Sequence, residues 1–127
     1  MTWFKPSREE TPPLIDDDYL ERLRGHLGDD VVEELLADGQ MELIDRAAQL
    51  DRLAADGDVE GMRRLSHDLI AVAGHLGLTA LSLAAVELNR RLRSAAPERL
   101  PQLATQVSVL SAASLDAIAN VRAATGS

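Results

Sequence analysis

The residues of this sequence that could do chemistry gather around His67. If the surrounding segment is a helix, Arg63 and Arg64 lie one turn before His67 and on the same side. Near neutral pH a histidine side chain is largely uncharged, and one of its ring nitrogens then carries a free lone pair. That nitrogen can attack a phosphoryl group, and the planar fork of an arginine can offset the negative charge of the product. The spacing therefore indicates a nucleophile with two anion-binding side chains beside it.

The apolar residues of the same segment predict that His67 points away from the protein core. Spacings of three and four place six apolar side chains on the side of the helix opposite His67: Met62, Leu65, Leu69, Val72, Ala73 and Leu76. On the outer side, the small residues Ala71 and Gly74 follow His67 by one and two turns, although glycine costs ~1 kcal/mol relative to alanine at such a site. They leave room for another protein to approach the ring. Ile70 is expected to add an exposed apolar contact, and His75 to lie at the rim of this surface.

The elements that must position this segment are predicted to be helical as well. Hydrophobic residues make up 46% of the chain but only three residues are aromatic, a composition that favours helix over sheet. Helical periodicity and turn residues predict five helices, at about residues 16–28, 29–55, 58–77, 79–94 and from Pro97 or Pro101 to 124. Asp16, Asp17 or Asp18 is expected to cap the first helix, Asp58 the third and Thr79 the fourth. Gly57 and Gly77 are expected in the turns on either side of the third helix. Short connections between long helices favour antiparallel neighbours. The predicted fold is therefore all-α: an antiparallel up-down-up-down four-helix bundle, preceded by a short N-terminal helix.

The predicted domain organisation is a single bundle with an arm in front of it. The bundle domain is expected to span residues 16–125. Residues 1–15 contain three prolines and no helical periodicity, which predicts a flexible N-terminal arm.

The segment from His67 to Gly77, HDLIAVAGHLG, resembles the phosphohistidine motif of histidine-containing phosphotransfer (HPt) domains. That motif reads approximately H-x-L-K-G-[SA]-[SA]-x-x-L-G. Five positions match it in spacing: His67, Leu69, Ala73, Leu76 and Gly77. Two positions depart from it, because Ile70 stands where the family usually has lysine and Ala71 where it has glycine. The resemblance extends over about residues 16–95.

The resemblance implies a phosphocarrier without independent catalytic activity. His67 would accept a phosphoryl group from the aspartate of a receiver domain and donate it to another in a phosphorelay. The partners would be receiver domains of hybrid histidine kinases or response regulators, which bring the magnesium, so the chain itself would need no cofactor. The receiver would dock over His67, with Tyr19, Leu20 and Leu23 as further candidate contacts. Arg63 and Arg64 are the candidate substitutes for the missing lysine.

Two other interpretations of the motif stay open. A bundle of this kind that is not phosphorylated would act as an adaptor, which binds a histidine kinase or a response regulator and modulates it by occupancy alone. The isoleucine at position 70 favours this alternative. The other interpretation is a helical domain of unrelated origin in which the match arose by chance.

Metal binding and a catalytic triad are not expected. His67 and His75 are eight residues apart, or ~12 Å along a helix, which is too far for both to bind one ion. Residues 66–68 read Ser-His-Asp, but adjacent residues of a helix point in different directions and cannot form a triad.

Charge and composition exclude some classes of partner. The net charge is −8, with 17 acidic and 6 basic residues in positions 1–60 against 4 and 7 in positions 61–127. An acidic protein repels phosphate backbones, so no nucleic-acid partner is expected. The chain has no cysteine, which favours a reducing compartment, and no stretch approaches the ~18 apolar residues of a membrane span. We therefore expect a cytoplasmic, monomeric protein without a membrane partner.

Overall fold

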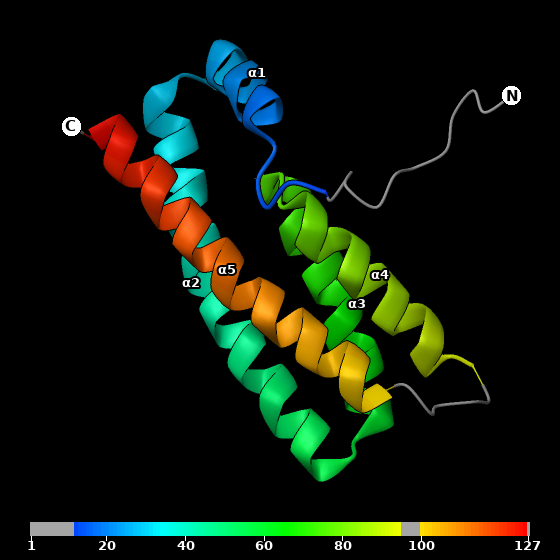
Figure 1. Cartoon of the computed structure of the whole chain (residues 1–127). Helices are drawn as coiled ribbons and strands as arrows, with labels where there is room; N and C mark the ends of the chain where they lie inside the picture. Colours follow the sequence, from blue (N-terminus) through cyan, green and yellow to red (C-terminus); the bar gives the residue numbers. More distant parts are fainter. Residues whose placement is uncertain (1–11, 95–99, 127) are drawn as a thin grey trace, which may run out of the picture.

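The computed structural model describes residues 12–94 and 100–126, and the regular structure in these ranges is entirely helical (Figure 1). Its five helices are α1 (Asp17–Leu27), α2 (Asp29–Asp56), α3 (Val59–Leu76), α4 (Thr79–Leu92) and α5 (Leu100–Gly126). Helices α2 to α5 form the bundle, in which α2 and α4 each pack against both α3 and α5. Helix α1 packs on α2 at one end of the bundle. The all-α bundle with a short helix in front is thus confirmed.

Aspartates and glycines set helix ends as predicted. The side chain of Asp16 accepts a hydrogen bond from a backbone N–H in the first turn of α1 (3.1 Å), and Asp58 does the same for α3 (2.8 Å). Gly57 and Gly77 end α2 and α3 with φ of +68° and +71°, the left-handed conformation that favours glycine. The turns on either side of α3 are therefore fixed by local sequence.

The start of α4 differs from the prediction. Thr79, the predicted N-cap, is the first helical residue, and Leu78 precedes it without a side-chain cap. The backbone N–H of Leu78 donates to the carbonyl of Ala73 (2.9 Å) and that of Thr79 to the carbonyl of Gly77 (3.1 Å), so the chain turns within two residues. Leu78 is fully buried. The carbonyl of Pro13, which accepts a hydrogen bond from the backbone N–H of Ala80 (3.0 Å), takes the place of a side-chain cap in the first turn of α4.

One hydrophobic core fills the space between the four long helices. Its fully buried large side chains include Leu36, Leu43 and Leu50 of α2, Leu69 and Leu76 of α3, Leu81 and Leu88 of α4, and Val107 and Ile118 of α5. The six apolar residues that predicted the inner side of α3 are all buried. The outward direction of position 67 follows from their burial.

A glycine brings α2 and α3 close together. Gly39 is buried in the middle of α2, and a Cβ atom placed there would lie 2.5 Å from Cδ2 of Leu76. Leu76 is itself buried, so its side chain has little room to move. Glycine at position 39 therefore allows the last turn of α3 to pack directly on the backbone of α2.

The last residues of the predicted N-terminal arm are held against the bundle. Its first part, residues 1–11, lies outside the described residues. The carbonyl of Pro13 accepts a hydrogen bond from the backbone N–H of Ala80 (3.0 Å), the N–H of Asp16 donates to the carbonyl of Gly77 (2.8 Å), and Ile15 packs against the core. The prediction of a flexible arm is therefore wrong for residues 12–15, because hydrogen bonds and an apolar contact hold them on the turn between α3 and α4.

Helix α5 is more apolar than expected. From Leu100 to Ala124 it is long and apolar enough to cross a membrane by length and composition alone, with a mean hydropathy of 1.2 over a window of 18 residues. The expectation that no segment has this property is wrong, because alanines occupy much of its outer face. In the structure α5 packs against α2 and α4 and places Val107 and Ile118 in the core. Its position is that of a core helix of the bundle.

Substitution of Gly39 by alanine tests the close approach of α2 and α3. We expect Gly39→Ala to lower the free energy of unfolding by about 1–3 kcal/mol, because the new methyl group overpacks a filled site. The control is Gly25→Ala in α1, where a Cβ atom would meet nothing within 4 Å. Since alanine is the better helix former, the control should gain up to ~1 kcal/mol. Urea unfolding followed by circular dichroism measures both, and equal stability of the two variants would contradict the packing described.

Candidate functional site

His67 lies in the middle of α3 with an exposed side chain, as predicted. It lines a shallow depression of about 550 Å³ on the seam between α3 and α4. The residues that line this depression are Arg63, Arg64, His67, Asp68, Asn89 and Arg93. A histidine thus shares one open site with three arginines, a combination suited to receiving an anionic group.

The two arginines predicted beside His67 share a carboxylate. Arg63 donates to Glu60 through Nε (3.2 Å) and through a second, shorter bond from Nη2, while Nη1 of Arg64 lies 3.9 Å from the same carboxylate. The hydrogen bond from Arg63 holds the pKa of Glu60 below its ordinary value, and the charges of both arginines act in the same direction. Glu60 in turn raises the pKa of Arg63. An anionic group bound beside His67 would therefore have to compete with Glu60 for Arg63.

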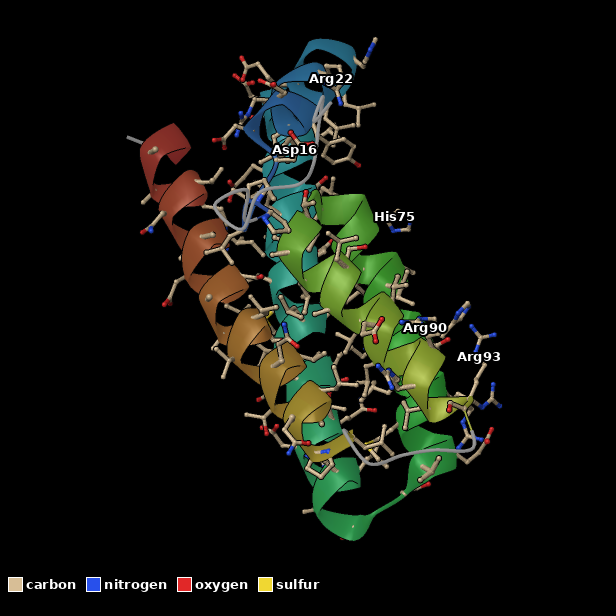
Figure 2. All side chains as sticks on the ribbon, turned by 45° about the vertical axis from the view of Figure 1, so that its right-hand side comes forward. Asp16, Arg22, His75, Arg90 and Arg93 are labelled. Atoms are coloured by element: carbon tan, nitrogen blue, oxygen red, sulfur yellow. The ribbon has the colours of Figure 1, made fainter. Side chains whose placement is uncertain are left out.

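Arg93, at the end of α4, is a site residue that the sequence analysis missed. Its neighbours Arg90 and Arg91 both pair with Glu87, at 2.6 and 3.0 Å, and their hydrogen bonds lower the pKa of Glu87. Arg93 is exposed and makes no side-chain ion pair within the described residues. Figure 2 shows Arg90 and Arg93 on the same side of the molecule as His75 of α3. Of the three arginines that line the depression, Arg93 is therefore the one whose charge is least compensated by acidic side chains of the described residues.

Asn89 ties α4 to the turn of α3 that precedes His67. Its Nδ2 donates to Oγ of Ser66 (2.9 Å) and to the carbonyl of Arg63 (3.1 Å). Ser66 is completely buried, and its hydroxyl also donates to the carbonyl of Arg63 (2.9 Å). These hydrogen bonds fix the position of α3 relative to α4 at the turn that precedes His67. Nothing in the sequence indicates this role for Ser66, because a sequence alone does not show which residues of two helices contact each other.

The remaining predicted residues lie further along α3. Ala71, Gly74 and His75 are exposed, and a Cβ atom at Gly74 would meet nothing within 4 Å, so the outer face after His67 is open as expected. Ile70 is different: it is half-buried and packs against the core. It lies one turn after Ser66, on the flank of α3 that faces α4. The expected full exposure of Ile70 is therefore wrong, and its contact with a partner stays a prediction.

Helix α1 reaches α3 through Tyr19. The hydroxyl of Tyr19 donates to the backbone carbonyl of His75 (2.9 Å). Of the other two candidate contacts in α1, Leu23 packs against the core, and Leu20 is buried in it and does not face a partner. Across the described residues, no group of three or more His, Cys, Asp or Glu side chains could hold a metal ion.

Comparison with protein-family models finds no match, and comparison with curated proteins finds none either. Among solved structures, the crystal structure of histidine-containing phosphotransfer protein B from Pseudomonas aeruginosa PAO1 is similar to this one. The TM-score is 0.77 and the sequence identity 23%, over 87% of this chain and 95% of that chain. The fold is that of a histidine-containing phosphotransfer protein. The HPt fold expected from the motif at His67 is thus confirmed.

The hydrogen bonds of Asn89 are expected to stabilise the HPt fold at the seam between α3 and α4. Asn89→Ala removes both of them and leaves the buried hydroxyl of Ser66 with fewer partners. The free energy of unfolding should fall by about 1–2 kcal/mol, as measured by urea unfolding. Asn120→Ala, at an exposed asparagine of α5, is the control and should change it little. Equal effects of the two substitutions would show that these hydrogen bonds do not stabilise the seam.

Proposed function

We propose that this chain is a histidine phosphotransfer protein of a phosphorelay. His67 accepts a phosphoryl group from the aspartate of one receiver domain and donates it to another. The observation that carries the proposal is the position of His67: it is exposed on an HPt fold, in a depression that also holds three arginines. The receiver domains belong to hybrid histidine kinases or response regulators, and the protein acts as a cytoplasmic monomer.

The proposed reaction is a phosphoryl exchange between two side chains. The lone pair of a ring nitrogen of His67 forms a bond to phosphorus as the bond from phosphorus to the aspartate oxygen breaks, and the aspartate leaves as a carboxylate. The reverse step returns the phosphoryl group to a second aspartate. The receiver holds the magnesium, and this chain has no cofactor of its own. Its own residues present the nucleophile and help to balance the charge of the product.

Arginines take the place of the lysine that the HPt motif has at position 70. Arg93 approaches the depression from α4, and Arg63 and Arg64 approach it from α3. Residues 59–94 contain five arginines against three acidic residues, so the face around His67 is basic in a protein that is acidic as a whole. This basic face complements an acidic phosphorylation site on a receiver and favours its docking.

An adaptor that binds a kinase or response regulator without being phosphorylated is the second candidate. The observation in its favour is Ile70, which is half-buried and offers no charge where the motif has lysine. The two candidates differ in whether His67 ever carries a phosphoryl group, and that difference can be measured directly.

Transfer of label to His67 decides between the two candidates. Purified protein is mixed with phosphorylated receiver domains, and we expect an acid-labile, base-stable label that His67→Gln abolishes. Because the side chain is exposed, His67→Gln should change the free energy of unfolding by no more than about 0.5 kcal/mol. His75→Gln, at an exposed histidine of the same helix, should keep the label. Binding of a receiver without any labelling of the native protein would support the adaptor instead.

Arg93 is expected to increase the rate of transfer. Arg93→Ala should slow labelling about two- to fivefold, the effect of one partly screened charge on the transition state. Arg52→Ala removes an exposed arginine of α2, outside the depression, and should leave the rate unchanged. The effect of Arg93→Ala should shrink as salt is raised, because salt screens exposed charges. An unchanged rate in Arg93→Ala at low salt would remove this arginine from the site.

A further inference from the structure

The seam between α2 and α5 lies on the opposite side of the bundle from His67. In the order α2, α3, α4, α5 around the core, the pair α3–α4 carries the histidine and the pair α5–α2 closes the far side (Figure 1). Side-chain hydrogen bonds of Ser108 and Arg122, the latter to both Glu33 and Gln40, set the register of this far side. Oγ of Ser108 donates to Asp51 (2.9 Å), and Nε of Arg122 donates to Glu33 (2.8 Å). The antiparallel helices are thus held at both ends of the seam.

Apolar side chains are exposed along this seam. Met41 and Ile44, between these contacts on α2, are 70% and 51% exposed, and Val109 of α5 is 61% exposed. They belong to stripes with spacings of three and four that differ from the core stripes of the same helices. On α2 the stripe is Ala37, Met41, Ile44 and Ala48; on α5 it is Thr105, Val109, Ala112 and, after Asp116, Ala119. The second stripe is apolar throughout on α2 and interrupted by Thr105 and Asp116 on α5, and no described part of the chain covers Met41, Ile44 or Val109.

A cleft opens at one end of the seam. It has a volume of about 550 Å³ where α2 ends and α5 begins, and most of its lining is apolar, including Ala55, Val59, Met62, Leu100, Ala104 and Val109. Val109 belongs both to the cleft and to the α5 stripe, so the two form one continuous surface. From Met41 to Ala55 this surface is about 21 Å long, or four turns of helix. Its length and its 3–4 spacing match the footprint of one docked helix.

The charges around the surface indicate what kind of helix fits. Glu34, Asp38 and Asp45 flank the stripe on α2, and Asp116 interrupts it on α5. Residues 16–58 as a whole contain 14 acidic and 4 basic side chains, a net charge of −10. Like charges disfavour a second copy of this chain at this face, and they also disfavour an anionic lipid surface. A helix with basic residues beside its apolar stripe complements both the exposed apolar side chains of the seam and the acidic flank of α2.

We propose that the α2–α5 seam and its cleft form a second docking site, which binds a basic amphipathic helix of a partner protein. Apolar side chains of that helix pack on Met41, Ile44 and Val109, and its lysines or arginines lie against the acidic flank of α2. The α3–α4 face stays free, so a protein held at the seam leaves His67 accessible. The proposal does not depend on phosphotransfer at His67.

A model peptide tests the proposal on the full chain. The probe is a fluorescent helix of leucine and lysine, about 18 residues long, with its leucines at 3–4 spacing. Its matched control has the same composition in an order that spreads leucine around the helix. Fluorescence anisotropy should show tighter binding of the amphipathic probe. Ile44→Glu should weaken that binding at least about tenfold, since it places a charge in the centre of the interface. Leu83→Glu, at a 55% exposed leucine of α4, should leave it unchanged.

Mapping of the bound peptide by NMR identifies the face that it uses. Shifts of backbone amide signals should be confined to α2, α5 and the start of α3. Equal binding of both peptides, unchanged affinity in Ile44→Glu, or shifts centred on the α3–α4 face would overturn the proposal.

Two further measurements test other occupants of the seam. A dimer in sedimentation that Ile44→Glu abolishes would assign the face to a second copy of the chain. Emission of Trp3, the only tryptophan, should be the same in the native protein and in Ile44→Glu. A shift of that emission would assign the face to the N-terminal segment and would also overturn the proposal.

Discussion

Burial of one side of α3 is the constraint on which the rest of the structure depends. Each leucine that α3 buries contributes about 1.5–3 kcal/mol relative to an exposed one, so the helix cannot rotate without a large loss of stability. Gly39 lets the end of α3 press against α2, and the bonds of Asn89 hold its middle against α4. His67 has no comparable anchor of its own. Its outward direction is a consequence of what the opposite side of the helix buries.

Most of the positive charges around His67 are paired with neighbouring acidic side chains. Glu60 forms ion pairs with Arg63 and Arg64 and partly compensates their charge. Glu87 does the same for Arg90 and Arg91 of α4. Such exposed pairs add little stability, but they prevent a cluster of arginines on one face from repelling itself. Arg93 takes part in neither group of ion pairs, so its charge keeps the depression around His67 positive. The protein thereby combines a basic face with a strongly acidic opposite side.

The fold could be predicted from the sequence because its signals are local. Spacings of three and four located the helices, and Gly57 and Gly77 located the turns on either side of α3. The same periodicity gave the direction of His67. What it could not give is the packing of one helix against another. Arg93 enters the depression only because α4 ends beside the middle of α3, and Ile70 is covered because its flank of α3 faces α4. Both facts depend on the register between helices, which a single sequence does not show.

The hydrogen bonds that hold the start of the described chain also bear on how the protein folds. Tyr19 bonds to the carbonyl of His75, 56 positions later in the sequence, and the carbonyl of Pro13 is met by α4. During synthesis these partners emerge from the ribosome after Pro13 and Tyr19, so the two hydrogen bonds cannot form until α3 and the start of α4 have been made. Each of α2, α3 and α4 packs on the helix that follows it in the chain. Such local contacts favour rapid folding. Helix α1 can pack on α2 as soon as that helix is made, whereas the bonds of Pro13 and Tyr19 must await the turn between α3 and α4.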